Sequence, residues 1–341
     1  MRNGMFLVSF FVLTILLSVC LFTPVWAEVI SGSMISLDGP DWLLAMDPEN
    51  AGRDQGWFNA PRPDAKTAKV PGIIQETFPA YHGVVWYYRQ FKAPRNPHQE
   101  GRYLLRFWQV DYLADVWING KHAGQHEGTG EPFVLDVTEA IKPQADNLMA
   151  VRVLNPRHEA IDGITLGQST VWARGIPCSP GLALNYGGLI DSVELLIAPA
   201  VRVEDLYVRP DPATGKIRIQ ANLRNAGPKA VTGKINFAAA PANQGETLQM
   251  VQVDRSLPVG DSVIEAELKL KNPRLWELND PYMYRVSAQV STDGSNSVDE
   301  FSTRFGYRDF RFQDGYFRLN GRRFLVKSSQ TDARAPIPGR F

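Results

Sequence analysis

The dipeptide Asn119-Gly120 constrains the fold most, because it lies between two segments of strand-like sequence. Asn and Gly both accept the positive φ angles that a two-residue β-hairpin requires at its central positions. Before the turn, residues 114–118 alternate between small or branched apolar side chains and Asp or Trp, which is the period of a half-buried strand. Beyond it, residues 131–138 predict another strand. Antiparallel β-structure is therefore expected around this turn.

Short strand-like segments continue through the first folded unit, predicted over residues 35–199. No amphipathic helix of ordinary length occurs there, and only residues 73–78 and 138–141 suit single helical turns. Gly (28 residues) and Pro (24 residues) together exceed the average of about 12%. Many short strands separated by turn residues predict a β-sandwich of the jelly-roll kind. The predicted strands cover residues 84–91, 103–107, 113–118, 133–137, 148–154 and 192–197.

A second unit of about 100 residues, predicted over residues 200–306, carries seven further strand-like segments. This size and strand number are typical of an immunoglobulin-like sandwich. The chain has two cysteines, of which Cys20 lies in the N-terminal apolar segment, so Cys178 has no partner for an internal disulfide. The seven segments cover residues 201–208, 216–223, 233–238, 249–253, 263–268, 284–290 and 299–305.

The chain ends in a tail, residues 307–341, built around a second hairpin dipeptide, Asn320-Gly321. The apolar side chains of this tail have no obvious partner within the chain except the second unit. Two-stranded hairpins alone are marginally stable in water. We therefore expect a poorly anchored tail that proteases remove first, with disorder from residue 333 onward.

The first 27 residues have the composition of an export signal. Arg2 precedes an apolar run over residues 5–22, and Val25-Trp26-Ala27 places small residues where a signal peptidase requires them. We expect cleavage after Ala27 and export to the periplasm or the extracellular space, without stable membrane insertion afterwards. An uncleaved membrane anchor is the alternative, because the apolar run is long for a signal core.

Charge and motif content exclude several classes of function. Lys plus Arg and Asp plus Glu both number 36, so the formal net charge is zero. A neutral chain has no long-range attraction to nucleic acid or anionic membranes. No phosphate-binding Gly loop, zinc-ligand spacing or basic stripe occurs, so no cofactor or metal is expected. His122 and His126 are four residues apart, but hairpin and loop sequence surrounds them, so we expect solvated loop histidines.

Five sequence segments together resemble family 2 of the glycoside hydrolases, which includes β-galactosidases, β-glucuronidases and β-mannosidases. The longest covers residues 110–141, "VDYLADVWINGKHAGQHEGTGEPFVLDVTEAI". The others are "VPG" at 70–72, "VWYYRQF" at 85–91, "NYGGLIDSV" at 185–193 and "NPRLWELNDPYMY" at 272–284. The resemblance runs in the family's order through nearly all of the chain after the N-terminal segment.

The resemblance implies an N-terminal sugar-binding domain, an immunoglobulin-like domain and, from residue 307, the entrance to a (β/α)8 barrel. In this family both catalytic carboxylates lie inside the barrel, with the acid/base in an Asn-Glu pair, and this sequence contains no Asn-Glu dipeptide. A barrel needs about 250 residues, far more than follow Gly321. We therefore expect a non-catalytic part of an exported glycosidase that is inactive alone. A separately encoded catalytic barrel is a candidate partner. The alternative is a stand-alone carbohydrate-binding or cell-envelope adhesion module.

The long loops of residues 157–186 are the predicted carbohydrate contact, because loops on a rigid sandwich commonly carry function. Relatives in the family often place an Asp just before the "NYGG" segment, where this chain has Leu182, Ala183 and Leu184. Asp191 stands where they usually have Arg. Among the tryptophans, core packing is expected for Trp86, Trp108 and Trp117. The predicted sugar-binding residues are Trp172 and Arg174, followed by Asp162, Gln168, Asn185 and Tyr186.

Five carboxylates, including the sugar-binding candidate Asp162, are considered as catalytic residues. None has an identifiable partner, whereas glycoside hydrolysis needs two cooperating groups. Turn, surface or capping roles are therefore expected for Asp111, Glu127, Glu131, Asp162 and Asp191.

Overall fold

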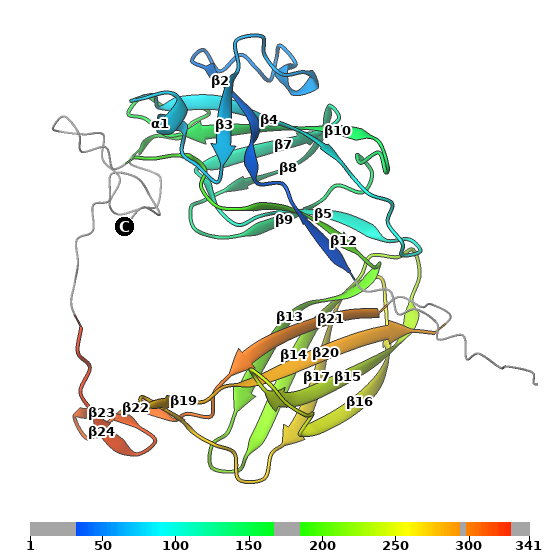
Figure 1. The fold of residues 1–341 in the computed structure, drawn as a ribbon, viewed down its shortest axis with the longest axis vertical. Coiled ribbons are helices and arrows are strands. Elements are labelled where there is room, and N and C mark those ends of the chain that lie inside the picture. Colours follow the sequence, from blue (N-terminus) through cyan, green and yellow to red (C-terminus); the bar gives the residue numbers. More distant parts are fainter. Residues whose placement is uncertain (1–31, 167–184, 294–297, 329–341) are drawn as a thin grey trace, which may run out of the picture.

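The computed structural model describes residues 32–166, 185–293 and 298–328, which fold into two β-sandwiches. Figure 1 shows the first sandwich above the second, with the chain passing once between them. In the described part, helix is limited to α1 (Ile74–Thr77) and one 3-10 turn (Trp57–Asn59). No helix in these ranges is both long and apolar enough to cross a membrane. The predicted signal segment lies outside the described residues.

The first sandwich contains a six-stranded and a four-stranded antiparallel sheet. The larger has the order β3-β2-β4-β10-β7-β8, and the smaller has the order β1-β12-β5-β9. A two-stranded ladder of β6 and β11 joins the loops at one end. The strands are β1 (Ser33–Ser36), β2 (Gly39–Asp47), β3 (Lys66–Val70), β4 (Gly83–Lys92), β5 (Arg102–Phe107), β6 (Val110–Asp111), β7 (Leu113–Ile118), β8 (Lys121–Glu127), β9 (Phe133–Asp136), β10 (Asp146–Asn155), β11 (Gly188–Leu189) and β12 (Val193–Ala198).

The central strands β4, β7 and β10 of the six-stranded sheet are largely buried on both faces. Side chains such as Leu105, Val116 and Val151 fill the space between the two sheets. A second apolar cluster, including Trp86 and Trp117, covers the outer face. All six residues of β7 are consequently buried. The expectation of a half-buried strand is therefore wrong, because the segment around the 3-10 turn covers the face that would otherwise meet water.

Asn119 and Gly120 form the predicted tight turn, with φ angles of 52° and 79°. The turn joins β7 to β8, whereas the segment predicted at 131–138 supplies β9, which pairs with β5 in the other sheet. His122 and His126 lie on β8. The assignment of these histidines to a loop is therefore wrong.

Two of the three tryptophans predicted in the core are there. Trp86 has no exposed surface and Trp117 is 7% exposed, but Trp108 is 40% exposed. The Arg106 guanidinium lies 4.6 Å from the centre of the Trp108 ring, whose Nε1 donates to Glu194 at 2.9 Å. Trp108 is therefore a surface residue held by polar partners, which corrects the sequence expectation.

The second sandwich places its strands in the seven predicted regions. Sheets of order β13-β14-β17 and β16-β15-β20-β21 face one another, and Phe237 and Ile217 are among the fully buried residues between them. The strands are β13 (Val201–Pro210), β14 (Lys216–Asn225), β15 (Val231–Pro241), β16 (Gln249–Leu257), β17 (Gly260–Lys269), β20 (Tyr284–Thr292) and β21 (Val298–Phe305).

The first part of the tail is anchored to the second sandwich, which corrects the expectation of a loose tail from residue 307. Tyr307 is fully buried, and its hydroxyl donates to the Gly215 carbonyl at 2.8 Å. Asn320 donates from Nδ2 to the Trp276 carbonyl at 3.0 Å. The remaining strands are β18 (Trp276–Glu277), β19 (Asp280–Pro281), β22 (Phe310–Gln313), β23 (Tyr316–Leu319) and β24 (Arg322–Phe324), of which the last three form one sheet.

Candidate functional site

The candidate site is the loop region that leaves β10 and returns to β11. The structure describes both ends of this region, residues 157–166 and 185–187. The predicted sugar contacts Gln168, Trp172 and Arg174 lie outside the described residues. The site is therefore built from its base, where the two ends of the loop meet the sandwich.

Asn185 closes the base of the loop. Its side chain is almost fully buried, with 1% exposed. Its Nδ2 donates to the backbone carbonyl of Pro156, and its Oδ1 accepts from Asn155 Nδ2 at 3.1 Å. These bonds hold the departing and the returning chain side by side, since Asn155 and Pro156 precede the loop and Asn185 follows it.

Gln75, in α1, extends this hydrogen-bond network into the sandwich. Its Nε2 donates to Asn155 Oδ1 at 3.1 Å and to the Tyr81 carbonyl at 2.7 Å. The His82 ring nitrogen Nδ1 also lies 3.0 Å from Asn155 Oδ1. Buried amides with several partners fix the geometry of the base, because leaving any of these groups unpaired would cost free energy.

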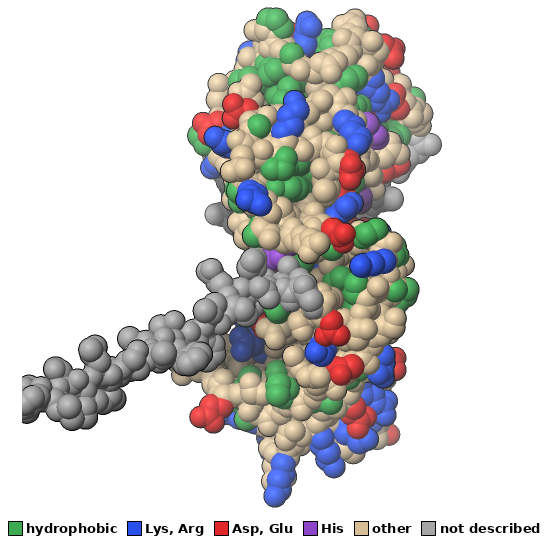
Figure 2. Space-filling model, turned by 90° about the vertical axis from the view of Figure 1, so that its right-hand side faces the viewer, with side chains coloured by type: hydrophobic (Ala, Val, Ile, Leu, Met, Phe, Trp, Pro, Cys, Tyr) green, Lys and Arg blue, Asp and Glu red, His purple; other side chains and the backbone are tan. Residues whose placement is uncertain are grey.

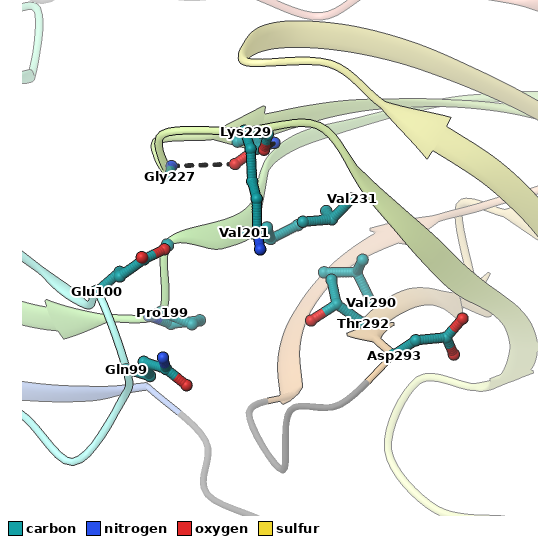
Figure 3. A pocket seen from close by; sticks show the side chains of 12 residues that line it. Gln99, Glu100, Pro199, Val201, Gly227, Lys229, Val231, Val290, Thr292 and Asp293 are labelled. Atoms are coloured by element: carbon teal, nitrogen blue, oxygen red, sulfur yellow. Dashed lines mark hydrogen bonds between the residues drawn. The ribbon is translucent and has the colours of Figure 1, made fainter.

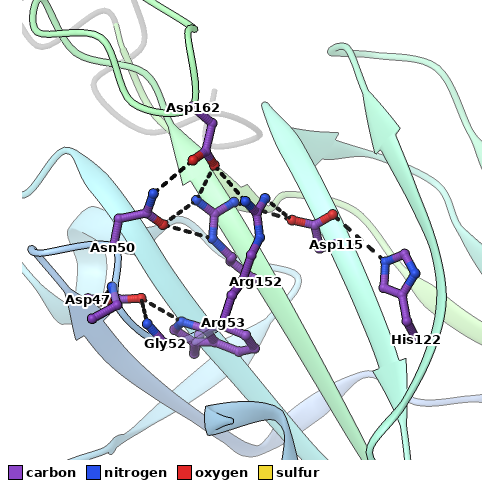
Figure 4. Close-up of polar contacts among 10 residues, drawn as sticks. Asp47, Asn50, Gly52, Arg53, Asp115, His122, Arg152 and Asp162 are labelled. Atoms are coloured by element: carbon purple, nitrogen blue, oxygen red, sulfur yellow. Dashed lines mark hydrogen bonds and ion pairs between the residues drawn. The ribbon is translucent and has the colours of Figure 1, made fainter. Parts of the chain in front are cut away.

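Arg152 provides a second anchor for the loop, from the outer face of the six-stranded sheet. Its side chain has no exposed surface, yet it lies among polar partners (Figure 4). Its Nη2 donates to Asp162 Oδ2 at 2.6 Å and to Asn50 Oδ1 at 2.6 Å. Its Nη1 lies 3.3 Å from Asp115 Oδ2 on the neighbouring strand β7. The loop residue Asp162 is thereby tied to the sheet.

Arg53 completes this charge cluster from the segment after β2. Its guanidinium pairs with Asp115 at 2.5 Å and with Asp162 at 3.1 Å. Two arginines therefore face two aspartates, as Figure 4 shows. Such balance matters, because a buried charge is tolerated only when it is paired and hydrogen-bonded.

The cluster keeps Asp162 ionised. Burial disfavours its charged form, but Arg152, the hydrogen bond from Asn50 and Arg53 outweigh burial, so the pKa of Asp162 lies below its ordinary value. Burial, followed by repulsion from Arg53, lowers the pKa of Arg152. Asp162 is thus an ionised carboxylate whose charge is paired with two arginines of the same chain.

The described members of the predicted sugar-binding set differ in their surroundings. Asp162 and Asn185 use their polar atoms to hold the base of the loop. Tyr186 is half-buried, and burial raises the pKa of its hydroxyl. Direct sugar contact by these residues stays a prediction, whereas their roles at the loop base are observed.

Sequence reasoning missed the residues that anchor the loop, above all Arg152, Asp115 and Gln75. One signal was available for the first two. Charged side chains in the middle of strand-like segments have to find partners if both faces of the sheet are covered. Asp115 and Arg152 lie directly opposite one another on β7 and β10, a pairing that the sequence alone did not give.

The structure shows the surroundings of two further carboxylates that the sequence singled out. Asp111 is buried on β6, which corrects its placement at the surface or in a turn. Glu127 accepts a hydrogen bond from the Tyr112 hydroxyl at 2.7 Å. The ranges that the structure covers contain no group of three His, Cys, Asp or Glu side chains that could hold a metal ion.

A hollow at the junction of the two sandwiches is lined by polar groups, including Glu100, Lys229 and Asp293 (Figure 3). Asp293 pairs with Lys234 at 2.9 Å. Asn225 is turned into its own loop, where Oδ1 accepts from Gly227 N at 3.0 Å. Asp293 and Asn225 are therefore both engaged in bonds within the second sandwich.

Comparisons with known proteins agree with the two-sandwich architecture. The sugar-binding domain of glycosyl hydrolases family 2 matches residues 73–199. The model for glycosyl hydrolases family 2 itself matches residues 201–308. The two matches therefore meet at the junction between the sandwiches.

Individual relatives are similar over most of this chain. A β-galactosidase of Thermoanaerobacter pseudethanolicus is 25% identical over 88% of the chain and 39% of the relative. A β-glucuronidase of Paenibacillus borealis is 24% identical over 88% of the chain and 49% of the relative. The structure of a β-glucuronidase from Ruminococcus gnavus in complex with D-glucuronic acid matches with a TM-score of 0.67 and 25% identity, over 87% of this chain and 49% of that one.

The chain thus spans less than half the length of these relatives. What it shares with them is the order, extent and fold of two all-β domains. The chain therefore belongs to family 2 of the glycosyl hydrolases.

Proposed function

We propose that this chain is the non-catalytic, sugar-binding part of a glycosidase that hydrolyses β-linked glycosides. In this proposal the first sandwich is the family's jelly-roll domain and the second its immunoglobulin-like domain. The observation that carries the proposal is the family match of both sandwiches, combined with a loop base built by Asn185 and Arg152. Such a base can present loop side chains to a ligand from a rigid scaffold.

The proposed ligand is a β-linked galactoside or glucuronide. The curated relatives above are named β-galactosidase and β-glucuronidase, and one structural relative holds D-glucuronic acid. In this chain the candidates for contact are Trp172 and Arg174, followed by Gln168 and Tyr186. An aromatic ring can cover the apolar face of a sugar, while Arg and Gln donate hydrogen bonds to its hydroxyls.

The proposed partner of the C-terminal sheet is a catalytic barrel, in the same polypeptide or separately encoded. Phe312 is 66% exposed and Phe317 is 40% exposed on the sheet formed by β22, β23 and β24. Exposed aromatic side chains on neighbouring strands are typical of an interaction surface. Residues 307–328 would then be the entrance to that barrel.

Export also belongs to the proposal, on the strength of the N-terminal sequence. Its apolar run followed by Val25-Trp26-Ala27 favours a cleaved signal. N-terminal sequencing of the protein purified from its host would give a start at Glu28. A start at Met1 would contradict cleavage.

The experiment that tests sugar binding is calorimetric titration of the purified chain with neutral β-linked galactotetraose. We expect saturable binding that Trp172→Ala weakens at least about tenfold, or about 1.4 kcal/mol. Phe301→Ala, an exposed aromatic residue on β21 of the second sandwich, is the matched control and should leave affinity unchanged. Equal affinity of Trp172→Ala and the native chain would contradict the proposed contact.

A further inference from the structure

A cleft in the second sandwich is unrelated to the loop region of the first. It lies where the edge strands β13 and β21 meet, close to β18. Figure 1 shows β13 and β21 side by side in this sandwich. The cleft is lined mainly by aromatic and basic side chains. Its larger side chains include Tyr207, Arg209, Trp276, Met283, Arg304 and Arg308.

Two arginines of this cleft carry positive charge that the described carboxylates do not neutralise through ion pairs. In the part of the chain that the structure describes, neither Arg209 nor Arg304 has a carboxylate within 4.0 Å. Both side chains are exposed. Arg308 interacts with an aromatic ring, with its guanidinium 5.3 Å from the centre of Trp276.

Strand pairing adds like charges beside the cleft. Arg209 lies directly opposite Arg218 on β14, and Arg304 lies directly opposite Arg285 on β20. Like charges that face each other across two strands destabilise the pairing. Glu267 offsets only part of this repulsion, at 3.9 Å from Arg218. A bound anion would relieve the remainder.

Trp276 forms one aromatic wall of the cleft and is anchored through its backbone. The backbone N of Trp276 donates to the Tyr307 carbonyl at 2.8 Å, and its carbonyl accepts from Asn320. Gly306 passes so close that an added Cβ would lie 3.0 Å from the Trp276 Cβ. Tyr207, 57% exposed, supplies a second ring. Anchoring of the Trp276 backbone reduces the conformational freedom that this residue would lose on binding a ligand.

We propose that this cleft binds the carboxylate of an acidic oligosaccharide, such as a chain of uronic acids. Guanidinium groups match the planar carboxylate with two parallel hydrogen bonds, and the aromatic rings can cover the sugar ring that carries it. The choice of a glycan rests on the proposed function, whereas the choice of an acidic one rests on the unpaired arginines. Nucleic acid is disfavoured, because the formal net charge is zero and acidic and basic side chains are interspersed on the face shown in Figure 2.

The test is calorimetric titration of the full chain with tetragalacturonate. We expect saturable binding that the double variant Arg209→Ala/Arg304→Ala weakens at least about tenfold. Arg255→Ala is the control. Arg255 is an exposed arginine on β16, at the other edge of the sheet that holds Arg304, and it has no ion pair with any described residue. Unchanged melting temperatures would show that the variants fold, as expected for exposed side chains.

Three results would overturn the proposal. The first is absence of tetragalacturonate binding, and the second is equal loss in the double variant and in Arg255→Ala. The third is displacement of tetragalacturonate by an equimolar concentration of inorganic sulfate, which would show a general anion site. Because Trp172→Ala should leave tetragalacturonate binding intact, and galactotetraose reports on the first sandwich, failure of the two proposals can be told apart.

Discussion

Arg152 Nη2 lies 2.6 Å from Asp162 Oδ2, and this contact ties the loop region of the first sandwich to the middle of its largest sheet. Arg152 is on β10 and is fully buried, whereas Asp162 lies in the chain that leaves β10. The buried charge of Arg152 therefore holds the first part of this loop against the sheet. The loop base has two locks, one ionic at Asp162 and one of amides at Asn185.

Replacing Arg152 by Met should destabilise the first sandwich strongly. The change leaves Asp115 and Asp162 with one cation, and breaking a buried ion pair by removing one partner costs about 3–5 kcal/mol. Urea unfolding followed by Trp fluorescence would measure the loss. Arg224→Met is the control, because its pair with Asp261 is exposed and should contribute little. Equal losses in both variants would contradict the ionic lock.

Acidification should weaken the same lock. The pKa of Asp162 is lowered in the folded chain, so its stabilising contribution is complete above its ordinary pKa of 3.8 and is lost as pH falls through the lower folded value. The free energy of unfolding should therefore fall more steeply between about pH 5 and pH 2 in the native chain than in Asp162→Asn. The exposed Glu131→Gln serves as control. A slope that Asp162→Asn leaves unchanged would show that Asp162 does not contribute.

Asn185→Ala should open the loop base without unfolding the sandwich. The variant strands the Pro156 carbonyl and Asn155, and an unsatisfied buried polar group costs about 1–3 kcal/mol. Limited proteolysis with mass spectrometry should show faster cleavage within residues 157–186 than in the native chain. Asn279→Ala, at an exposed position, should leave the cleavage rate unchanged. Faster cleavage in the second sandwich instead would contradict a local role.

Asn320→Ala should loosen the C-terminal sheet. Asn320 bonds to both the Trp276 carbonyl and Glu277, and its Oδ1 accepts from Asp309 N at 2.9 Å. In the native chain, proteolysis should stop near residue 328 because Tyr307 and Asn320 dock the preceding segment. The variant should be cut within residues 308–328. The control Gln313→Ala, an exposed residue on β22, should resemble the native chain. Early cutting within residues 308–328 of the native chain would show that the sheet is not anchored.

The strands and tight turns could be predicted from sequence because their signals are local. Asn119-Gly120 and Asn320-Gly321 both form turns with positive φ angles, and every predicted strand region holds a strand. Burial was harder to predict. β7 alternates like a half-exposed strand, but a segment from before α1 covers its second face, so Asp115 finds Arg152 rather than water.

The candidate site could be located but not assembled from sequence. The loop-like sequence pointed to residues 157–186, and Asp162 and Asn185 do lie at the base of that region. Asn50, which bonds to Asp162, and Gln75, which bonds to Asn155, come from distant parts of the chain, so no spacing rule connects them to the loop. The tail was misjudged for the same reason, since the Tyr307 hydroxyl donates to the Gly215 carbonyl, 92 residues earlier.

The central claim is that the two sandwiches bind sugar and do not cleave it. The most direct measurement is nitrophenol release from nitrophenyl β-galactoside and β-glucuronide by the purified 341-residue chain. We predict no release above that of a blank preparation, when the same protein sample binds galactotetraose saturably. Release above the blank that follows the protein through purification would contradict the claim, because it would require a catalytic carboxylate pair within these two sandwiches.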